Sequence, residues 1–161
     1  AEGEGRRLAD IIRMPPFKVV ITNAALVTDT WVVKEFELFF GQCYEERRVP
    51  ADPSVVFDSG NDYMRQPDST AAKGVDKDLE SNWTADCKIG LGGCQPYATY
   101  IGLDITGTRA WAEAYKPNVS DDVYEAAEVH CIRLYQSENP LYKADAIAIQ
   151  EVRPGGSGYI Y

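Results

Sequence analysis

Alternation between apolar and polar positions recurs along the chain and predicts strands rather than helices. The clearest case is residues 31–40, WVVKEFELFF. Because successive strand residues point to opposite faces, the more apolar parity of this segment is expected to face the core. That parity comprises Val32, Lys34, Phe36, Leu38 and Phe40. Further segments with apolar or alternating patterns typical of strands are 17–28, 55–57, 98–105, 128–136 and 145–152.

Turn-forming residues separate these strands, and neither strand–helix alternation nor an internal repeat is visible. Many short strands joined by turns are typical of an all-β antiparallel sandwich or jelly roll. We expect one domain over residues 17–152. Residues 1–16 form an N-terminal arm that ends at Pro15 and Pro16, and residues 153–161 form a C-terminal tail. Residues 109–127 are ambiguous, because alanine and glutamate favour a helix whereas Pro117 breaks one.

Charge narrows the classes of partner. The chain has 161 residues, is 45% hydrophobic and carries a formal net charge of −9. Nucleic-acid phosphates and anionic membrane surfaces attract clustered Lys and Arg, so both are disfavoured. Surplus carboxylates suit hard cations, or they simply keep the protein soluble. No apolar run reaches the ~20 residues that a transmembrane helix needs.

Four cysteines, Cys43, Cys87, Cys94 and Cys131, allow three full pairings. A local bridge between Cys87 and Cys94 is sterically easy, and Cys43 and Cys131 would then link an early strand to a late one. These bridges favour an oxidising compartment, extracellular, secretory or lumenal, whereas reduced buried thiols are the alternative. The chain begins at Ala1 rather than Met, so we expect that a targeting segment was removed or that the chain is an expression product.

Residues 71–105 form the most distinctive segment of the sequence. An acidic turn, Val75 to Asn82, leads into Trp83, a cysteine-bracketed glycine-rich loop and the strand ATYIGLDI. This order resembles the discoidin or coagulation-factor C-type family, with its galactose-binding-like domain. The sequences of segments 31–40, 128–136 and 145–152 are similar to those of strands in that family. The resemblance implies a jelly-roll sandwich in which 109–127 is an insertion and Trp83 lies in the core.

The resemblance also implies a structural calcium ion. Asp76, Asp78 and Ser81 stand where calcium-containing relatives carry oxygen ligands, and Glu151 stands where they bring a remote carboxylate. Lys77 replaces the usual glycine, which is expected to shift the turn. The alternative is a turn whose carboxylates accept hydrogen bonds only from local backbone N–H groups.

A ligand site is expected on the loops at one end, since sugar-binding relatives use aromatic, Arg and Asn side chains there. Residues of these types are Asn61, Tyr63, Arg65, Tyr97 and Trp111, with Asp62 beside them. No motif fixes any of them, and ordinary turn residues are the alternative reading. Trp111 lies in the ambiguous segment and, if exposed, suits stacking on a sugar or docking of a partner.

No catalytic motif occurs, and the single histidine, His130, lies inside a predicted strand, which is typical of a structural residue. We therefore expect a non-catalytic binding module for carbohydrate or for a glycoprotein or protein surface. The alternative is an accessory subunit of a larger, organellar or membrane-associated complex that docks through residues 1–16, 109–127 and 153–161.

Two triplets match the acceptor pattern for N-linked glycans. They are Asn82-Trp83-Thr84 and Asn118-Val119-Ser120. The first abuts the predicted core tryptophan, which argues against modification there. The second is feasible if the protein is secreted.

Overall fold

The computed structural model describes residues 15–87 and 92–153. The predicted arm therefore lies outside the described residues except for Pro15 and Pro16, which are buried, and the predicted tail does so except for Arg153.

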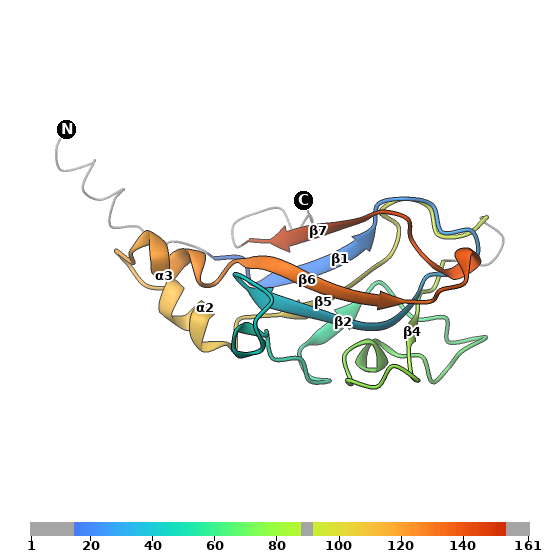
Figure 1. Ribbon diagram of the computed structural model, residues 1–161, viewed down its shortest axis with the longest axis horizontal. Helices are drawn as coiled ribbons and strands as arrows, with labels where there is room; N and C mark the ends of the chain where they lie inside the picture. The colour runs from blue at the N-terminus through green and yellow to red at the C-terminus, as the bar shows by residue number, and fades with distance from the viewer. Residues whose placement is uncertain (1–14, 88–91, 154–161) are drawn as a thin grey trace.

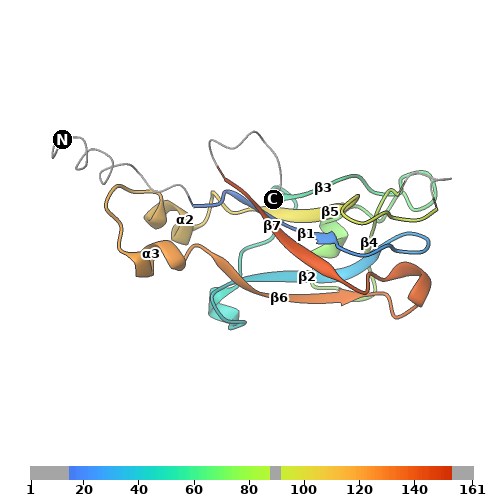
Figure 2. The same ribbon diagram turned by 90° about the horizontal axis from the view of Figure 1, so that it is seen from above.

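Two antiparallel sheets face each other as two layers (Figures 1 and 2). One sheet has the order β3 (Val56–Asp58), β5 (Tyr100–Asp104), β1 (Lys18–Asn23) and β7 (Ile147–Val152). The other has the order β4 (Trp83–Thr84), β2 (Val32–Phe40) and β6 (Val129–Gln136). The predicted all-β antiparallel sandwich is thus confirmed. Each predicted strand is present, but the first is half as long as predicted, the strand expected at 55–57 is shifted by one residue, and the others are one to three residues shorter.

The ambiguous segment 109–127 forms two short helices that pack on each other, α2 (Arg109–Ala114) and α3 (Asp121–Glu125). Side chains cap both: Thr108 Oγ1 accepts from Trp111 N, and Ser120 Oγ accepts from Val123 N. The three 3₁₀ turns are η1 (Glu45–Arg47), η2 (Ala71–Gly74) and η3 (Pro140–Tyr142). None of the helices within the described ranges has the length and apolarity to cross a bilayer.

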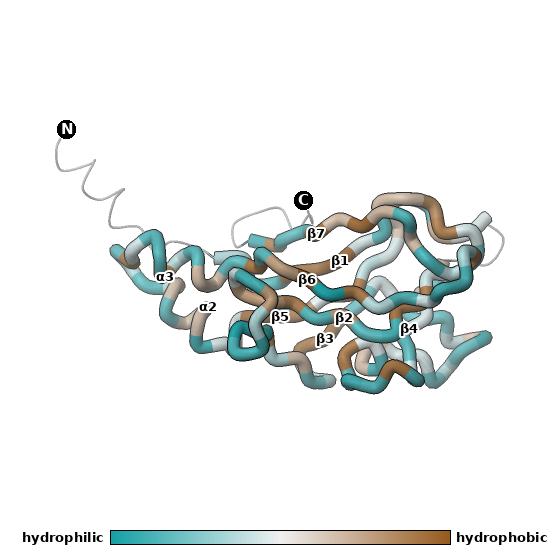
Figure 3. The backbone as a smooth tube through the Cα atoms, in the orientation of Figure 1, coloured by the Kyte–Doolittle hydropathy of each residue, from teal (hydrophilic) through white to brown (hydrophobic). Residues whose placement is uncertain are grey.

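The core lies between the sheets and is built mainly from side chains of β1 and β5 on one side and β2 on the other. Hydrophobic stretches run along β1, β3 and β5 (Figure 3). Trp31 and Trp83 meet edge to face with ring centroids 5.7 Å apart, and both are fully buried. The indole N–H groups of these two tryptophans both have a partner. Trp31 donates to Gln136 of β6 over 2.9 Å, and Trp83 donates to Asp58 of β3 over 2.7 Å. The prediction that Trp83 lies in the core is confirmed, and its bond to Asp58 ties the two sheets together.

The first half of β2 does not follow the predicted core parity. Phe36, Leu38 and Phe40 face the core as expected, but Val33 takes the place expected for Val32 and Lys34. The pairing of β2 with β6 shifts register between Val33 and Glu35. Such an irregularity inserts one residue and reverses the alternation, which a period-two pattern does not reveal.

Glu35 lies on the other face of β2, as the alternation predicts, but the 75–81 turn covers it there and leaves it only 2% exposed. Its Oε2 accepts a hydrogen bond from Lys77 N over 2.9 Å, and the guanidinium of Arg48 lies 3.7 Å from Oε1. Burial raises the pKa of Glu35 from 4.5 to about 7, because desolvation of the carboxylate outweighs the Lys77 hydrogen bond and Arg48, and the nearby Asp76 and Glu37 raise it further.

Both expected disulfides are present. Cys43–Cys131 joins the segment after β2 to β6 with Cα atoms 5.4 Å apart, and Cys87–Cys94 closes a short loop with Cα atoms 4.8 Å apart. The two bridges are compatible with a secreted or lumenal protein, because such bonds persist in oxidising compartments.

Candidate functional site

A polar depression of about 300 Å³ opens at the end of the sandwich that carries β4 and η3. We call it the loop-end pocket. Four chain segments contribute to it, namely the β1–β2 connection, the loop after β3, the approach to β4, and η3. Its lining residues are Asp29, Thr30, Val32, Asp62, Arg65, Gln66, Asn82, Thr84 and Tyr142.

Backbone hydrogen bonds hold these four segments against one another. Ala85 N donates to Trp31 O over 2.9 Å, Asp62 N donates to Thr84 O over 2.9 Å, and Asp29 N donates to Leu141 O over 2.9 Å. Because amide groups paired in this way resist local opening, the pocket walls are set by the fold rather than by the side chains alone.

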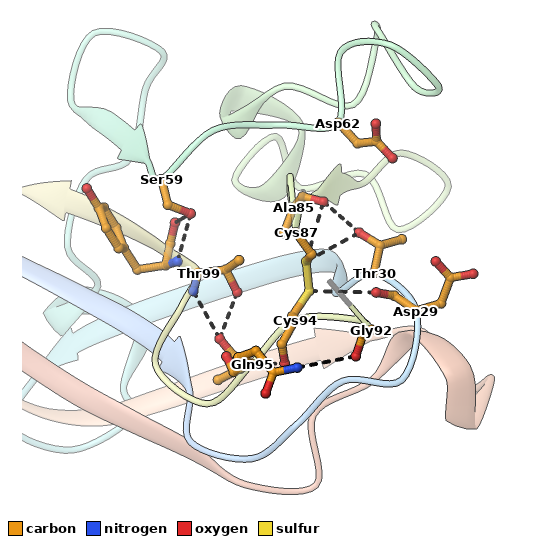
Figure 4. Close-up of a disulfide and its surroundings, with 12 residues drawn as sticks. Asp29, Thr30, Ser59, Asp62, Ala85, Cys87, Gly92, Cys94, Gln95 and Thr99 are labelled. Atoms are coloured by element: carbon orange, nitrogen blue, oxygen red, sulfur yellow. Dashed lines mark hydrogen bonds between the residues drawn. A yellow bond between two sulfur atoms is a disulfide. The ribbon is translucent and has the colours of Figure 1, made fainter. Parts of the chain in front are cut away.

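The Cys87–Cys94 disulfide supports the same wall (Figure 4). Thr30 Oγ1 donates to the Ala85 carbonyl over 2.6 Å and lies 3.9 Å from Cys87 Sγ. Cys94 is fully buried and exchanges two backbone hydrogen bonds with Val27. The disulfide therefore anchors the β1–β2 connection that presents Asp29 and Thr30.

Arg65 is the central charge of the pocket. Its Nε donates to Asp62 Oδ2 over 2.6 Å, and its Nη2 lies 3.6 Å from Asp29 Oδ1. The hydrogen bond to Asp62 raises the pKa of Arg65 above its ordinary value, so the guanidinium keeps its charge. Asp62 is buried, whereas Arg65 is 48% exposed and keeps N–H donors toward solvent. The result is a fixed fork of donors flanked by carboxylate acceptors.

The predicted ligand residues are distributed over the molecule rather than gathered. Arg65 lines the pocket, and Tyr63, 69% exposed, lies two residues away on the same loop. Asn61 is half-buried and forms a β-bridge with Ala85. The structure thus brings Arg65 and its neighbour Asp62 into the site and leaves Asn61 in the scaffold beside it.

Tyr97 and Trp111 lie outside the pocket lining. Tyr97 is 59% exposed, has a φ of 63° and donates its backbone N–H to Asn23 O over 2.6 Å. Trp111 belongs to α2 at the other end of the sandwich, is half-buried and stacks on Tyr115 with ring centroids 4.7 Å apart. Trp111 therefore does not form an exposed platform for a sugar or a partner.

Sequence reasoning missed most of the pocket, including Asp29, Gln66, Asn82 and Tyr142. In the sequence, Asp29 and Thr30 are recognisable only as a turn after the first predicted strand. Tyr142 lies in a segment that carries no motif. Nothing in the local pattern relates positions 29, 62, 82 and 142, because β-sandwich topology brings them together from distant parts of the chain.

The carboxylates of the acidic turn accept hydrogen bonds from groups within the turn itself, which is the alternative expected from the sequence. Asp76 Oδ1 accepts from Asp78 N over 3.1 Å, and Asp76 Oδ2 accepts from Ser81 Oγ over 2.5 Å. Asp78 Oδ1 accepts from Glu80 N over 2.9 Å. Lys77, at the position where the resemblance predicts a glycine, adopts a φ of 61°, the left-handed conformation that glycine reaches without strain.

Glu151 lies apart from that turn. It belongs to β7, opposite Val19 of β1, and forms an ion pair with Arg153 over 2.5 Å. Across residues 15–87 and 92–153, no group of three or more His, Cys, Asp or Glu is arranged to hold a metal ion. The structure does not bring Glu151 together with Asp76, Asp78 and Ser81 as one set of ligands, and we derive no role for calcium from these residues.

His130 lies in β6, as the strand pattern predicts. Its side chain is 53% exposed, and its Nε2 lies 3.4 Å from Glu128 Oε2.

Comparison with known proteins returned no match among family models, among curated proteins or among solved structures. The likeness to the galactose-binding-like family stays a prediction that rests on the residues quoted for it.

Proposed function

We propose that the protein is a non-catalytic carbohydrate-binding module and that the loop-end pocket is its binding site. The observation that carries this proposal is the Asp29–Arg65–Asp62 arrangement, in which a permanent cation is held between two carboxylates at the mouth of an open polar depression.

The pocket chemistry suits sugar hydroxyl groups. A hydroxyl both donates and accepts, so a sugar needs acceptors and donors side by side. Asp29 supplies acceptor oxygens, Arg65 supplies donors in a planar fork, and the Gln66 and Asn82 amides supply both. Tyr142 adds an aromatic ring at the wall, which can cover an apolar sugar face.

Charge favours neutral sugars or amino sugars over acidic ones. The pocket contains two carboxylates against one guanidinium, and the whole chain carries −9. A sialic or uronic acid would bring a further carboxylate close to Asp29 and would be repelled. At a ligand efficiency of about 0.3 kcal/mol per heavy atom, we expect a monosaccharide Kd of about 1 mM.

The test is a glycan array that contains neutral, amino and acidic sugars, followed by calorimetry with the best ligand. Arg65→Ala should weaken binding at least about tenfold, because it removes the donor fork and leaves the buried Asp62 carboxylate without its guanidinium partner. Arg109→Ala is the matched control, since Arg109 is an exposed, ion-paired arginine on α2. No binding to any sugar, or equal losses in the two variants, would overturn the proposal.

A second candidate function, an accessory subunit of a larger complex, is favoured by one further observation. An open groove of about 530 Å³ lies between the end of β2 and α3, and Tyr44 on its rim is 56% exposed. Tyr44→Glu should abolish co-purification with native partners, whereas Tyr63→Glu, at another exposed tyrosine, should not. Co-purification that survives Tyr44→Glu would remove this candidate.

A further inference from the structure

The two glycan acceptor triplets occupy opposite structural settings. An N-linked glycan needs an asparagine amide that is open to solvent, and it places a bulky polar group at the surface. Burial and hydrogen bonding therefore discriminate between the two triplets even though their sequence patterns are equivalent.

The triplet at Asn82 is built into the second sheet. Trp83 is fully buried and pairs with Val33, and Thr84 is 3% exposed and pairs with Val32. Thr84 Oγ1 donates to Asn82 Oδ1 over 2.8 Å, so the hydroxyl and the amide of this triplet are bonded to each other. A glycan on Asn82 would also fill the loop-end pocket that this residue lines.

The triplet at Asn118 lies in the turn between α2 and α3. Asn118 and Ser120 are exposed, as are Lys116 and Pro117 before them. Asn118 has a φ of 59°, in the left-handed region that asparagine tolerates better than most residues. Its side-chain amide makes no hydrogen bond to any other residue of the described ranges. Ser120 Oγ accepts from Val123 N at the start of α3, which leaves its own O–H free to donate.

The two disulfides are compatible with the oxidising compartment in which N-linked glycans are added. Cys43–Cys131 and Cys87–Cys94 are bonds that form and persist in oxidising compartments such as the secretory pathway. The chain therefore combines an open acceptor asparagine with covalent bonds typical of the same route.

We propose that Asn118 is an N-glycosylation site and that Asn82 is not. The co-reactant is an oligosaccharide linked to a polyprenyl pyrophosphate. The side-chain amide nitrogen of Asn118 bonds to the anomeric carbon as the bond from that carbon to the pyrophosphate oxygen breaks. The lipid pyrophosphate leaves, the amide proton passes to a base of the transferase, and nothing is oxidised or reduced.

The position of Asn118 leaves the loop-end pocket open. The α2–α3 turn lies at the opposite end of the sandwich from β4 and η3 (Figure 1). A glycan on Asn118 would extend from that end into solvent. This inference does not depend on the proposed function, because it concerns a modification at another surface.

The experiment is expression of the chain behind a secretion signal in eukaryotic cells, with gel mobility compared before and after an amidase that removes N-linked glycans. We expect one mobility shift that Asn118→Asp and Ser120→Ala abolish and that Ser120→Thr and Asn82→Asp preserve. Asp suits the left-handed turn at 118, so Asn118→Asp should keep its fold.

Peptide mass spectrometry then locates the glycan, and circular dichroism shows that each secreted variant is folded. A glycan on the peptide that contains Asn118 supports the inference. A secreted, folded wild-type chain without a glycan there, or a shift that disappears with Asn82→Asp and persists with Asn118→Asp, would overturn it.

Discussion

At the end of the sandwich that carries β4 and η3, hydrogen bonds join four segments far apart in sequence, whereas at the other end residues 109–125 fold back on themselves as α2 and α3. The first end buries Trp31 and Trp83 and carries the ion pair between Arg65 and Asp62. The second presents exposed residues on two helices of six and five residues.

This difference indicates which end of the sandwich suits ligand binding and which end suits a bulky modification. A binding site needs side chains held in place before the ligand arrives, and the cross-linked loop end provides that order. A bulky modification needs a segment that can carry it without disturbing the core, and the turn between two short helices provides that freedom.

The sharpest test of the comparison is tryptophan truncation at each end. Trp83→Ala should lower the free energy of unfolding by about 4 kcal/mol, because it empties a fully buried site and leaves Asp58 without its indole partner. Trp111→Ala should cost less, about 1 kcal/mol, because that ring is only half-buried and stacks on Tyr115 at the edge of the core. Urea unfolding followed by circular dichroism measures both. Equal losses would show that the helical end is as integral to the core as the loop end.

A second prediction concerns Glu35, whose pKa is raised to about 7 by burial. Between pH 4.5 and about 7 the unfolded chain releases this proton while the folded protein keeps it, so stability falls as pH rises across that window. At about 1.4 kcal/mol per pH unit, the loss reaches about 3 kcal/mol. Glu35→Gln should therefore be more stable than wild type at about pH 8 by up to that amount, and equal to it at about pH 4.

The control for this experiment is Glu37→Gln, because Glu37 carries the ion pairs to Arg48 and Arg133 over 2.8 and 2.7 Å. That variant should lose stability at neutral pH instead of gaining it. A Glu35→Gln protein with the same pH profile as wild type would show that Glu35 is ionised in the folded state.

The smallest expected effect is at the acidic turn. Asp78→Ala removes the hydrogen bond from Glu80 N and should cost about 1 kcal/mol. The loss should be equal in calcium and in chelator, because the turn satisfies its own carboxylates. Asp145→Ala, an exposed carboxylate before β7, should change little under either condition. A loss at Asp78 that appears only in calcium would establish the cation site that the geometry does not support.

Much of the fold could be predicted from the chain because strand patterns are local. Alternation located the strands near their observed bounds, and the cysteine spacing was consistent with both disulfides. The parity of β2 could not be predicted, because the irregularity between Val33 and Glu35 depends on how β2 pairs with β6, about a hundred residues later. The same limit applied to the candidate site, where Arg65 was predicted but its partner Asp29 and the lining residue Tyr142 were not.

By itself, the sequence determined the all-β class and made the local Cys87–Cys94 bridge easy to expect, since hydrophobic period and short spacing act over a few residues. Only the tertiary structure decided which carboxylates matter: it buried Glu35, closed Asp76 and Asp78 into their own turn, and placed Asp29 and Asp62 on either side of Arg65. The physical reason is that solvation and charge pairing depend on neighbours in space, and in a β-sandwich those neighbours come from distant parts of the chain.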